Sequence, residues 1–310
     1  MTDKIPVDII MGTYNGAQFV TAQIDSLFAQ THRQWRLLVR DDCSADNTVV
    51  RLKAASDNDD RIHLVTDNLG NLGVNRNFNH LLALSTARYV MYCDQDDVWL
   101  PRKIELTLDE MLLAENDELC RPTLVHCDAI VTDTDLAIVQ NRFIGLRGRR
   151  KGLSALLFAN CVQGAAMMIN APLRERVLRA QPVLPYDYHN ALIAVATGQR
   201  RFIDQALLLY RQHSRNVIGA GSFDQAPSTA NVARTLQMAI NAFPRIQETL
   251  CFFGTELSPE TVKELNDFSQ LLFGKNTLKR LFIAFHRRYG FYRRRDSLNL
   301  LLYICHLSNF

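Results

Sequence analysis

The sequence predicts an α/β fold in which helices flank a mostly parallel central sheet, followed by a helical C-terminal extension. Three observations lead to this expectation. Strand-like and helix-like patterns alternate through the first 130 residues, polar clusters follow three of the predicted strands, and the pattern after residue 221 is helical to the end. The chain has 310 residues, of which 47% are hydrophobic, so it can bury a full core.

Four short apolar runs define the predicted strands of the N-terminal part. They cover residues 7–11, 35–40, 61–65 and 88–93. Helices are expected between them, one after Gly16, one over about 47–55 and one over 74–84, where apolar residues recur near helical spacing. In such sheets ligands bind outside the carboxyl ends of the strands. The polar residues that follow residues 7–11, 35–40 and 88–93 are therefore expected to share one edge.

The remaining sequence is less regular. Residues 124–131 and 163–169 are predicted strands, residues 145–152 form a basic loop, and residues 187–197 form a helix that Gly198 closes. After residue 221 we expect helices with breaks near Pro244, Pro259 and Gly274.

An acidic cluster directly follows the strand at 88–93. Asp94, Asp96 and Asp97 lie within four residues, and their mutual repulsion is costly unless a cation or hydrogen-bond donors offset it. Hard divalent cations bind carboxylate oxygens and accept phosphate oxygens as further ligands. A solvated acidic turn is the alternative, but the position after a buried strand favours a Mg²⁺ or Mn²⁺ site.

A second acidic pair, Asp41 and Asp42, ends the strand at 35–40. Ser44 or Asp46 is expected to cap the helix that follows, and the pair exceeds what capping needs. A carboxylate can accept the imide N–H of uracil or thymine, and Tyr14 at the neighbouring strand end could stack on such a base. Each residue alone is more often structural.

Four motifs together resemble the family 2 glycosyltransferases of the GT-A type fold, in both order and spacing. They are Ile-Ile-Met-Gly-Thr-Tyr-Asn-Gly at 9–16, Asp-Asp-Cys-Ser-Ala-Asp-Asn-Thr at 41–48, Asn-Arg-Asn at 75–77, and Asp-Gln-Asp-Asp-Val-Trp-Leu-Pro-Arg-Lys at 94–103. The resemblance continues to Asp187, eleven residues before Gly198, and to Leu-Tyr-Arg-Gln-His-Ser-Arg-Asn at 209–216. That last motif is similar to the version in bacterial rhamnosyl- and glucosyltransferases of surface-polysaccharide assembly.

The resemblance covers roughly residues 5–220 and implies a domain plan. Residues 1–222 would form the GT-A type catalytic domain, with the nucleotide-sugar half at about 1–122 and the acceptor half at about 123–222. Residues 223–310 would be a helical C-terminal region that associates with a membrane or a partner.

The resemblance also implies a role for individual residues. Asp187 would be the catalytic base, although a simple helix N-cap is the alternative, and Tyr186 stands before it where many relatives have His or Glu. Asp96, Asp97 and His213 would hold Mg²⁺ or Mn²⁺. The donor and acceptor would contact Thr13, Tyr14, Asn15, Asp41, Asp42, Arg76, Asp94, Gln95, Gly164 and Arg211.

The implied activity is metal-dependent and inverting. A sugar would move from a pyrimidine nucleotide-sugar, dTDP-L-rhamnose or a UDP-hexose, to a hydroxyl of a lipid-linked glycan in O-antigen or exopolysaccharide assembly. One alternative is a sugar-phosphate nucleotidyltransferase, but its glycine-rich basic loop is missing from residues 12–16. A non-catalytic nucleotide- or glycan-binding module is another, which loss of Asp96 or Asp187 would suggest; both are present.

The charge distribution adds one expectation about partners. Residues 275–308 combine a basic cluster with apolar residues, which is typical of a helix lying on an anionic membrane surface. A helical appendage that packs on the catalytic domain is the alternative, and nucleic-acid binding is not expected. The chain has no run of 18 apolar residues and no signal-peptide core, and its seven cysteines are scattered. A cytoplasmic location follows, peripheral on the inner face of the cell membrane if the basic segment binds there.

Overall fold

The computed structural model describes residues 4–116, 120–158, 160–214 and 229–287. Its sheet has the strand order β3-β2-β1-β4-β8-β6-β9-β5, with β7 beside β6. β1 (Val7–Thr13), β2 (Trp35–Asp41), β3 (Ile62–Leu64) and β4 (Tyr89–Asp94) run parallel.

The second half of the sheet is mixed. β8 (Met167–Asn170) is antiparallel to β4 and β6 (Thr123–Thr132), whereas β9 (Gln199–Arg211) is parallel to β6. Two short strands, β5 (Val98–Trp99) and β7 (Ile138–Gln140), pair antiparallel with β9 and β6. The expected α/β sheet is confirmed, with a mixed second half.

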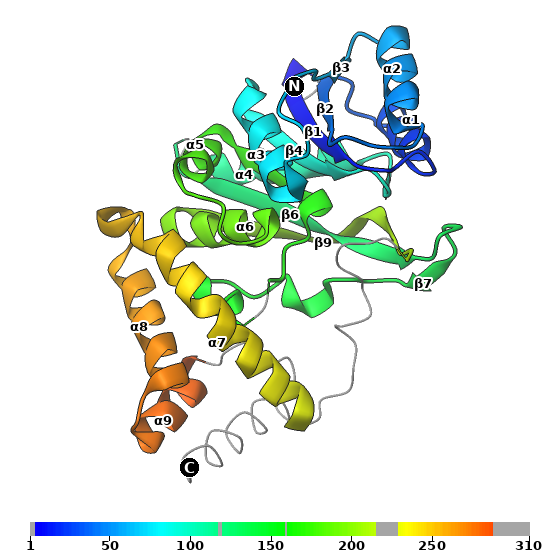
Figure 1. Cartoon of the computed structure of the whole chain (residues 1–310). Helices are drawn as coiled ribbons and strands as arrows, with labels where there is room; N and C mark the ends of the chain where they lie inside the picture. Colours follow the sequence, from blue (N-terminus) through cyan, green and yellow to red (C-terminus); the bar gives the residue numbers. More distant parts are fainter. Residues whose placement is uncertain (1–3, 117–119, 159, 215–228, 288–310) are drawn as a thin grey trace.

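Helices cover both faces of this sheet (Figure 1). Successive side chains of a strand point to opposite faces. In β4, accordingly, Met91 and Cys93 join one apolar cluster, whereas Val90 and Tyr92 join the other. The first cluster is covered by α1 (Val20–Phe28), α2 (Thr48–Asn58) and α4 (Lys103–Glu115), and the second by α3 (Gly73–Leu84), α5 (Ala171–Arg179) and α6 (Tyr186–Thr197).

The C-terminal helices extend the second cluster. They are α7 (Thr229–Cys251), α8 (Pro259–Phe273) and α9 (Thr277–Arg287), the yellow to orange helices below the sheet in Figure 1. Phe268 of α8 packs edge-on against Phe158 with ring centroids 4.9 Å apart, and Glu264 accepts a hydrogen bond from the Leu153 N–H at 3.1 Å. These helices therefore pack on residues of the expected catalytic domain. None of the described helices is both long and apolar enough to cross a bilayer.

Two predicted boundaries are wrong and two are confirmed. α7 continues through Pro244, because its apolar face, with Phe243 and Ile246 fully buried, outweighs the hydrogen bond that proline removes. α8 begins at Pro259 after a Ser258 N-cap and ends before Gly274, as expected. The strand predicted over 163–169 begins only at Met167, since residues 164–166 form a 3₁₀ turn. Strands β5, β7 and β9 were not predicted.

Candidate active site

The carboxyl ends of the parallel strands meet at one edge of the sheet, as predicted. Thr13 at the end of β1 lies opposite Asp41 of β2, and Gly12 lies opposite Asp94 of β4. The mixed half of the sheet adds His213, which follows β9 and contacts Asp96 at 2.8 Å. The structure thus collects residues from distant parts of the chain around the β4 end.

Asp41 is held by the turns that follow β1 and β2. Its carboxylate accepts hydrogen bonds from Thr13 Oγ1 at 2.9 Å and from the Ser44 hydroxyl and N–H at 2.6 and 2.7 Å. Asn15, with a left-handed φ of 48°, accepts the Ala45 N–H at 2.8 Å. Asn tolerates this backbone conformation better than most residues. Asp41 and Asn15 therefore fix the two turns against each other.

Asp42 is buried and accepts three hydrogen bonds from the protein itself. It accepts Arg40 Nη1 at 2.8 Å, the Leu72 N–H at 2.7 Å and the Gly73 N–H at 2.8 Å. These contacts tie the end of β2 to the start of α3. A contact between Asp42 and a pyrimidine stays a prediction.

Tyr14 and Gln95 form a second connection between strand ends. The Gln95 side-chain oxygen accepts the Tyr14 N–H and its amide donates to the Tyr14 carbonyl oxygen, both at 3.0 Å. The Tyr14 side chain is 54% exposed, so its ring is available to stack on a base. The Gln95 side chain therefore fixes the backbone of the turn that contains Tyr14.

The carboxylates after β4 have few hydrogen-bond donors. Asp97 is fully buried: its Oδ1 accepts the Arg211 N–H at 3.2 Å, and its Oδ2 has no partner among the described residues. Burial, and next the charge of Asp96, raise the pKa of both Asp94 and Asp97. Lys103 is also fully buried, with its Nζ 3.6 Å from the centre of the Trp99 ring. A bound cation would relieve the remaining excess of negative charge.

The predicted metal ligands are only partly assembled. His213 meets Asp96 and stacks on Phe19 with ring centroids 4.6 Å apart, whereas the Asp97 side chain faces the interior. Within the described ranges, no three His, Cys, Asp or Glu side chains are grouped around one metal position. Asp97 as a direct ligand therefore stays a prediction. Asp96 supplies the carboxylate oxygens that a hard cation prefers, and a metal held by Asp96 and His213 stays a prediction.

Arg211 acts on the acidic loop in this structure. Its Nε donates to the Asp96 carbonyl oxygen at 2.8 Å, and its guanidinium lies 5.0 Å from the centre of the Phe19 ring. The pairing of β5 with β9 brings these groups together, with Val98 opposite Leu209. Arg211 thus positions the loop, and its contact with a substrate stays a prediction.

Asp187 lies in the first turn of α6 with a raised pKa. The N-cap of α6 is Pro185, so the interpretation of Asp187 as a simple N-cap is wrong. The Asp187 carboxylate accepts the Tyr188 N–H at 2.7 Å, and burial raises its pKa to about 6. Its charge also contributes to the raised pKa of Asp94, whose carboxylate accepts a hydrogen bond from the adjacent Tyr186 hydroxyl at 3.2 Å. A carboxylate of this kind suits proton transfer near neutral pH.

Gly164 makes room for a neighbouring side chain. A Cβ atom at this position would lie 1.9 Å from the Tyr186 hydroxyl oxygen. The space next to Gly164 is therefore filled by Tyr186, and a direct contact of Gly164 with sugar or acceptor stays a prediction.

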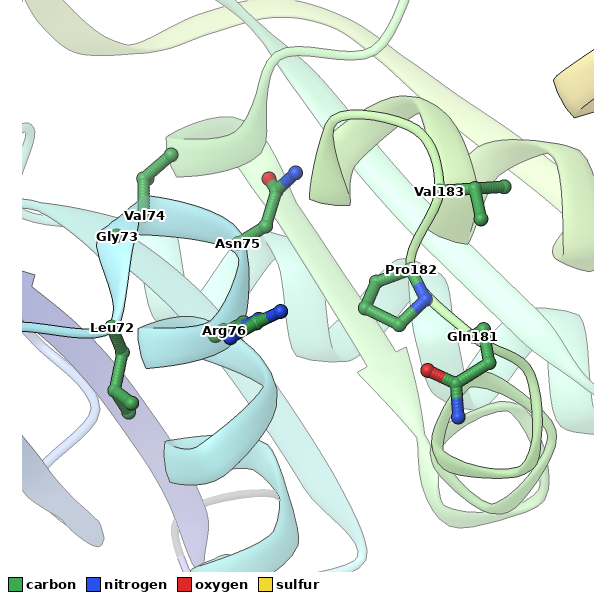
Figure 2. Close-up of a pocket in the computed structure, with 8 residues that line it drawn as sticks. All are labelled: Leu72, Gly73, Val74, Asn75, Arg76, Gln181, Pro182 and Val183. Atoms are coloured by element: carbon green, nitrogen blue, oxygen red, sulfur yellow. The ribbon is translucent and has the colours of Figure 1, made fainter. Parts of the chain in front are cut away.

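Arg76 lies at a pocket of about 460 Å³ beside this edge. Figure 2 shows its side chain pointing from α3 toward Gln181 and Pro182. The adjacent Asn75 bridges to α6, since it donates to the Leu184 carbonyl oxygen at 3.2 Å and accepts the Tyr186 N–H at 3.1 Å. A contact between Arg76 and the nucleotide stays a prediction.

Two residues that shape the site were missed in the sequence. The Phe19 ring packs against both His213 and Arg211. Lys103 places a buried amino group over the Trp99 ring. Lys103 ends the motif at 94–103, and a lysine directly after Leu-Pro-Arg in an acidic motif was the available signal. For Phe19 the sequence offers only helical spacing.

Two comparisons of the sequence with known proteins give significant matches. A sequence model described as Glycosyl transferase family 2 matches residues 8–175, more than half of the chain. Over 110 residues the chain is 37% identical to the UDP-Glc:alpha-D-GlcNAc-diphosphoundecaprenol beta-1,3-glucosyltransferase WfgD of Escherichia coli; this match covers 36% of the chain and 42% of that relative's length.

Two solved structures share the fold. The S. aureus TarS 1-349 complex with UDP-GlcNAc superimposes with a TM-score of 0.52 and 14% identity, covering 98% of this chain and 92% of that one. The mannosyltransferase PcManGT from Pyrobaculum calidifontis, in complex with GDP-Man and Mn2+, gives a TM-score of 0.52 and 13% identity over 99% and 88% of the two chains. The GT-A type fold is confirmed, and the chain belongs to glycosyl transferase family 2.

Proposed function

We propose that the protein is a metal-dependent, inverting glycosyltransferase. It moves a sugar from a pyrimidine nucleotide-sugar to a hydroxyl of a lipid-linked glycan in the assembly of a bacterial surface polysaccharide. The observation that carries the proposal is the hydrogen bond from Tyr186, the residue directly before Asp187, to Asp94, next to the contact between Asp96 and His213.

The residues divide the chemistry between them. Asp187 accepts the proton of the acceptor hydroxyl. The acceptor oxygen then forms a bond to the anomeric carbon while the opposite bond to the diphosphate oxygen breaks, so the configuration inverts. Asp96 and His213 would hold Mg²⁺ or Mn²⁺, which supplies charge neutralisation for the leaving diphosphate when bound. The exposed Tyr14 would stack on the pyrimidine, and Asp41 or Asp42 would accept its imide N–H.

The names of the similar proteins support the substrate classes. The E. coli relative is named for UDP-Glc and a diphosphoundecaprenol acceptor, and the P. calidifontis structure contains Mn2+. The motif at 209–216 favours dTDP-L-rhamnose, with UDP-glucose or UDP-galactose next.

A donor panel tests the proposal. The purified protein is incubated with Mn²⁺, an undecaprenyl-diphosphate-linked sugar and each of the three donors, and free nucleoside diphosphate is measured. Release of dTDP or UDP that requires the acceptor is expected, with an inverted anomeric centre in the product. Exchange of pyrophosphate into the donor would instead indicate a nucleotidyltransferase, and binding without any turnover would indicate a non-catalytic module.

We also propose that the C-terminal region docks on an anionic membrane. The expected segment is 275–308, of which residues 288–308 lie outside the described part of the chain. In α9 and the turn before it, Leu278 and Phe282 are 78% and 66% exposed beside the exposed Lys275 and Lys279. Apolar side chains flanked by basic ones match an anionic bilayer surface, where each basic residue contributes about 1 kcal/mol.

Vesicle sedimentation tests this surface. The protein should sediment with phosphatidylglycerol vesicles at low salt and not with phosphatidylcholine vesicles. Replacing Leu278 and Phe282 with Ser should release it, whereas the same change at Val139, which is 67% exposed on β7, should not. Unchanged sedimentation of the Leu278→Ser, Phe282→Ser protein would contradict the proposal.

A further inference from the structure

Tyr186 joins the donor side of the site to the helix that carries Asp187. Its hydroxyl donates a hydrogen bond to Asp94 Oδ1 at 3.2 Å, and its backbone N–H donates to Asn75 Oδ1 at 3.1 Å. Within the described part of the chain, no other hydrogen bond reaches the Asp94 carboxylate. The orientation of Asp94 therefore depends on Tyr186.

The Tyr186 ring is held from several sides. It stacks on Tyr92, with ring centroids 5.3 Å apart and an interplanar angle of 15°. It also packs against Phe78, with ring centroids 4.4 Å apart. Gly164 lies against its hydroxyl end, where any Cβ atom would collide with it. A ring confined in this way can place its hydroxyl at one position with little further loss of side-chain entropy.

The neighbouring Tyr92 has a different partner. Its hydroxyl accepts a hydrogen bond from Asn190 Nδ2 at 2.8 Å, in the fully buried interior of the same stack. The stack therefore contains one hydroxyl that is directed to the site and one that is not.

We propose that Tyr186 is a positioning residue for the nucleotide-sugar donor: its hydroxyl holds Asp94 Oδ1, so that Oδ2 is presented to a ribose hydroxyl of the nucleotide. The proposal rests on the proposed function, since it requires that this edge binds a nucleoside diphosphate. It also gives a role to the Tyr that replaces the His or Glu expected before the base. Because Tyr186 precedes Asp187 directly, donor binding and the start of the base helix share one side chain.

Calorimetric titration of UDP and dTDP in the presence of Mn²⁺ tests this role. Tyr186→Phe keeps the aromatic stack and removes only the hydroxyl, so its melting temperature should stay close to that of the wild type. Its affinity for the better nucleotide should fall about tenfold, the usual scale for a hydrogen bond to a charged group. Tyr92→Phe is the matched control and should bind the nucleotide like the wild type, whatever its stability.

A double-mutant cycle with Asp94→Asn makes the test independent of any small loss of stability. If Tyr186 acts through Asp94, adding Tyr186→Phe to Asp94→Asn should change the affinity little. Wild-type affinity of Tyr186→Phe, or additive losses in the double variant, would overturn the proposal. If the wild-type protein binds neither UDP nor dTDP, the proposed function fails instead, so the two failures are distinguishable.

Discussion

Two carboxylate clusters lie at the same edge of the sheet and differ in the number of hydrogen bonds that they accept from the protein. Asp41 and Asp42 each accept three hydrogen bonds from the protein. Asp94, Asp96 and Asp97 each accept one within the described ranges, and burial raises the pKa of Asp94 and Asp97. Identical side chains thus meet opposite environments within one site.

This difference suggests that one cluster stabilises the fold and the other takes part in the reaction. Asp41 and Asp42 have their charge offset by donors that also join turns and strands, so their removal should loosen the fold. The group formed by Asp94, Asp96, Asp97 and Asp187 has few donors for its negative charge, and such a group is stabilised by a cation or by protons. We expect its members to affect turnover more than stability.

The largest effect is expected at Asp187. Asp187→Asn should fold and bind nucleotide normally, but turnover should fall by roughly 10²–10⁴, because Asn cannot accept the acceptor proton. Initial rates of nucleoside diphosphate release measure this. Asp204→Asn is the matched control, because Asp204 is paired with Arg142 and Arg149 and has no role in the proposed chemistry. A well-folded Asp187→Asn enzyme with near wild-type rates would leave the base unidentified.

Asp96 should have the next largest effect. Asp96→Asn removes the carboxylate that meets His213, and turnover should fall by roughly 10²–10³, the scale for losing one group that stabilises developing charge. The Mn²⁺ concentration for half-maximal rate should rise, and the melting temperature should change little. Full turnover by the wild type in excess EDTA would contradict the metal role.

Replacing Asp42 should reduce stability more than turnover, the reverse of what is expected for Asp187 and Asp96. Asp42→Asn breaks a pair in which the side chains of Arg40 and Asp42 are only 3% and 6% exposed. The free energy of unfolding should fall by about 3 kcal/mol, the lower range for breaking a buried ion pair, since Arg40 keeps its contact with Asp67. Urea denaturation measures it, with Asp94→Asn as the comparison. A larger loss of stability from Asp94→Asn would reverse the proposed division between the clusters.

Much of the nucleotide side could be predicted from the sequence. The strands β1, β2 and β4 are continuous apolar runs, and parallel pairing places their ends together, so Thr13, Asp41 and Asp94 were expected at one edge. The position of Asp187 at the start of a helix was also readable from the apolar spacing of residues 191–196.

The rest depends on contacts that local patterns do not encode. His213 reaches Asp96 across 117 residues because β9 pairs with β5, and only the apolar run at 207–210 hinted at β9. The inward direction of Asp97 is set by that pairing through the Arg211 N–H. Neither follows from the spacing of acidic residues, because both depend on the pairing of strands that are far apart in the sequence.

The smallest expected effect concerns stability as a function of pH. The folded-state pKa of Asp187 is raised to about 6 from its ordinary 3.8, so the folded protein binds the proton more tightly than the unfolded chain. The charged side chain therefore destabilises the fold fully above pH 6 and not at all below pH 3.8. Removing the charge in Asp187→Asn should raise the melting temperature at pH 8 by about 2 °C and leave it nearly unchanged at pH 4. Melting curves of both proteins across this range measure the difference. A variant that is less stable than the wild type at pH 8 would mean that Asp187, like Asp42, belongs to the architecture.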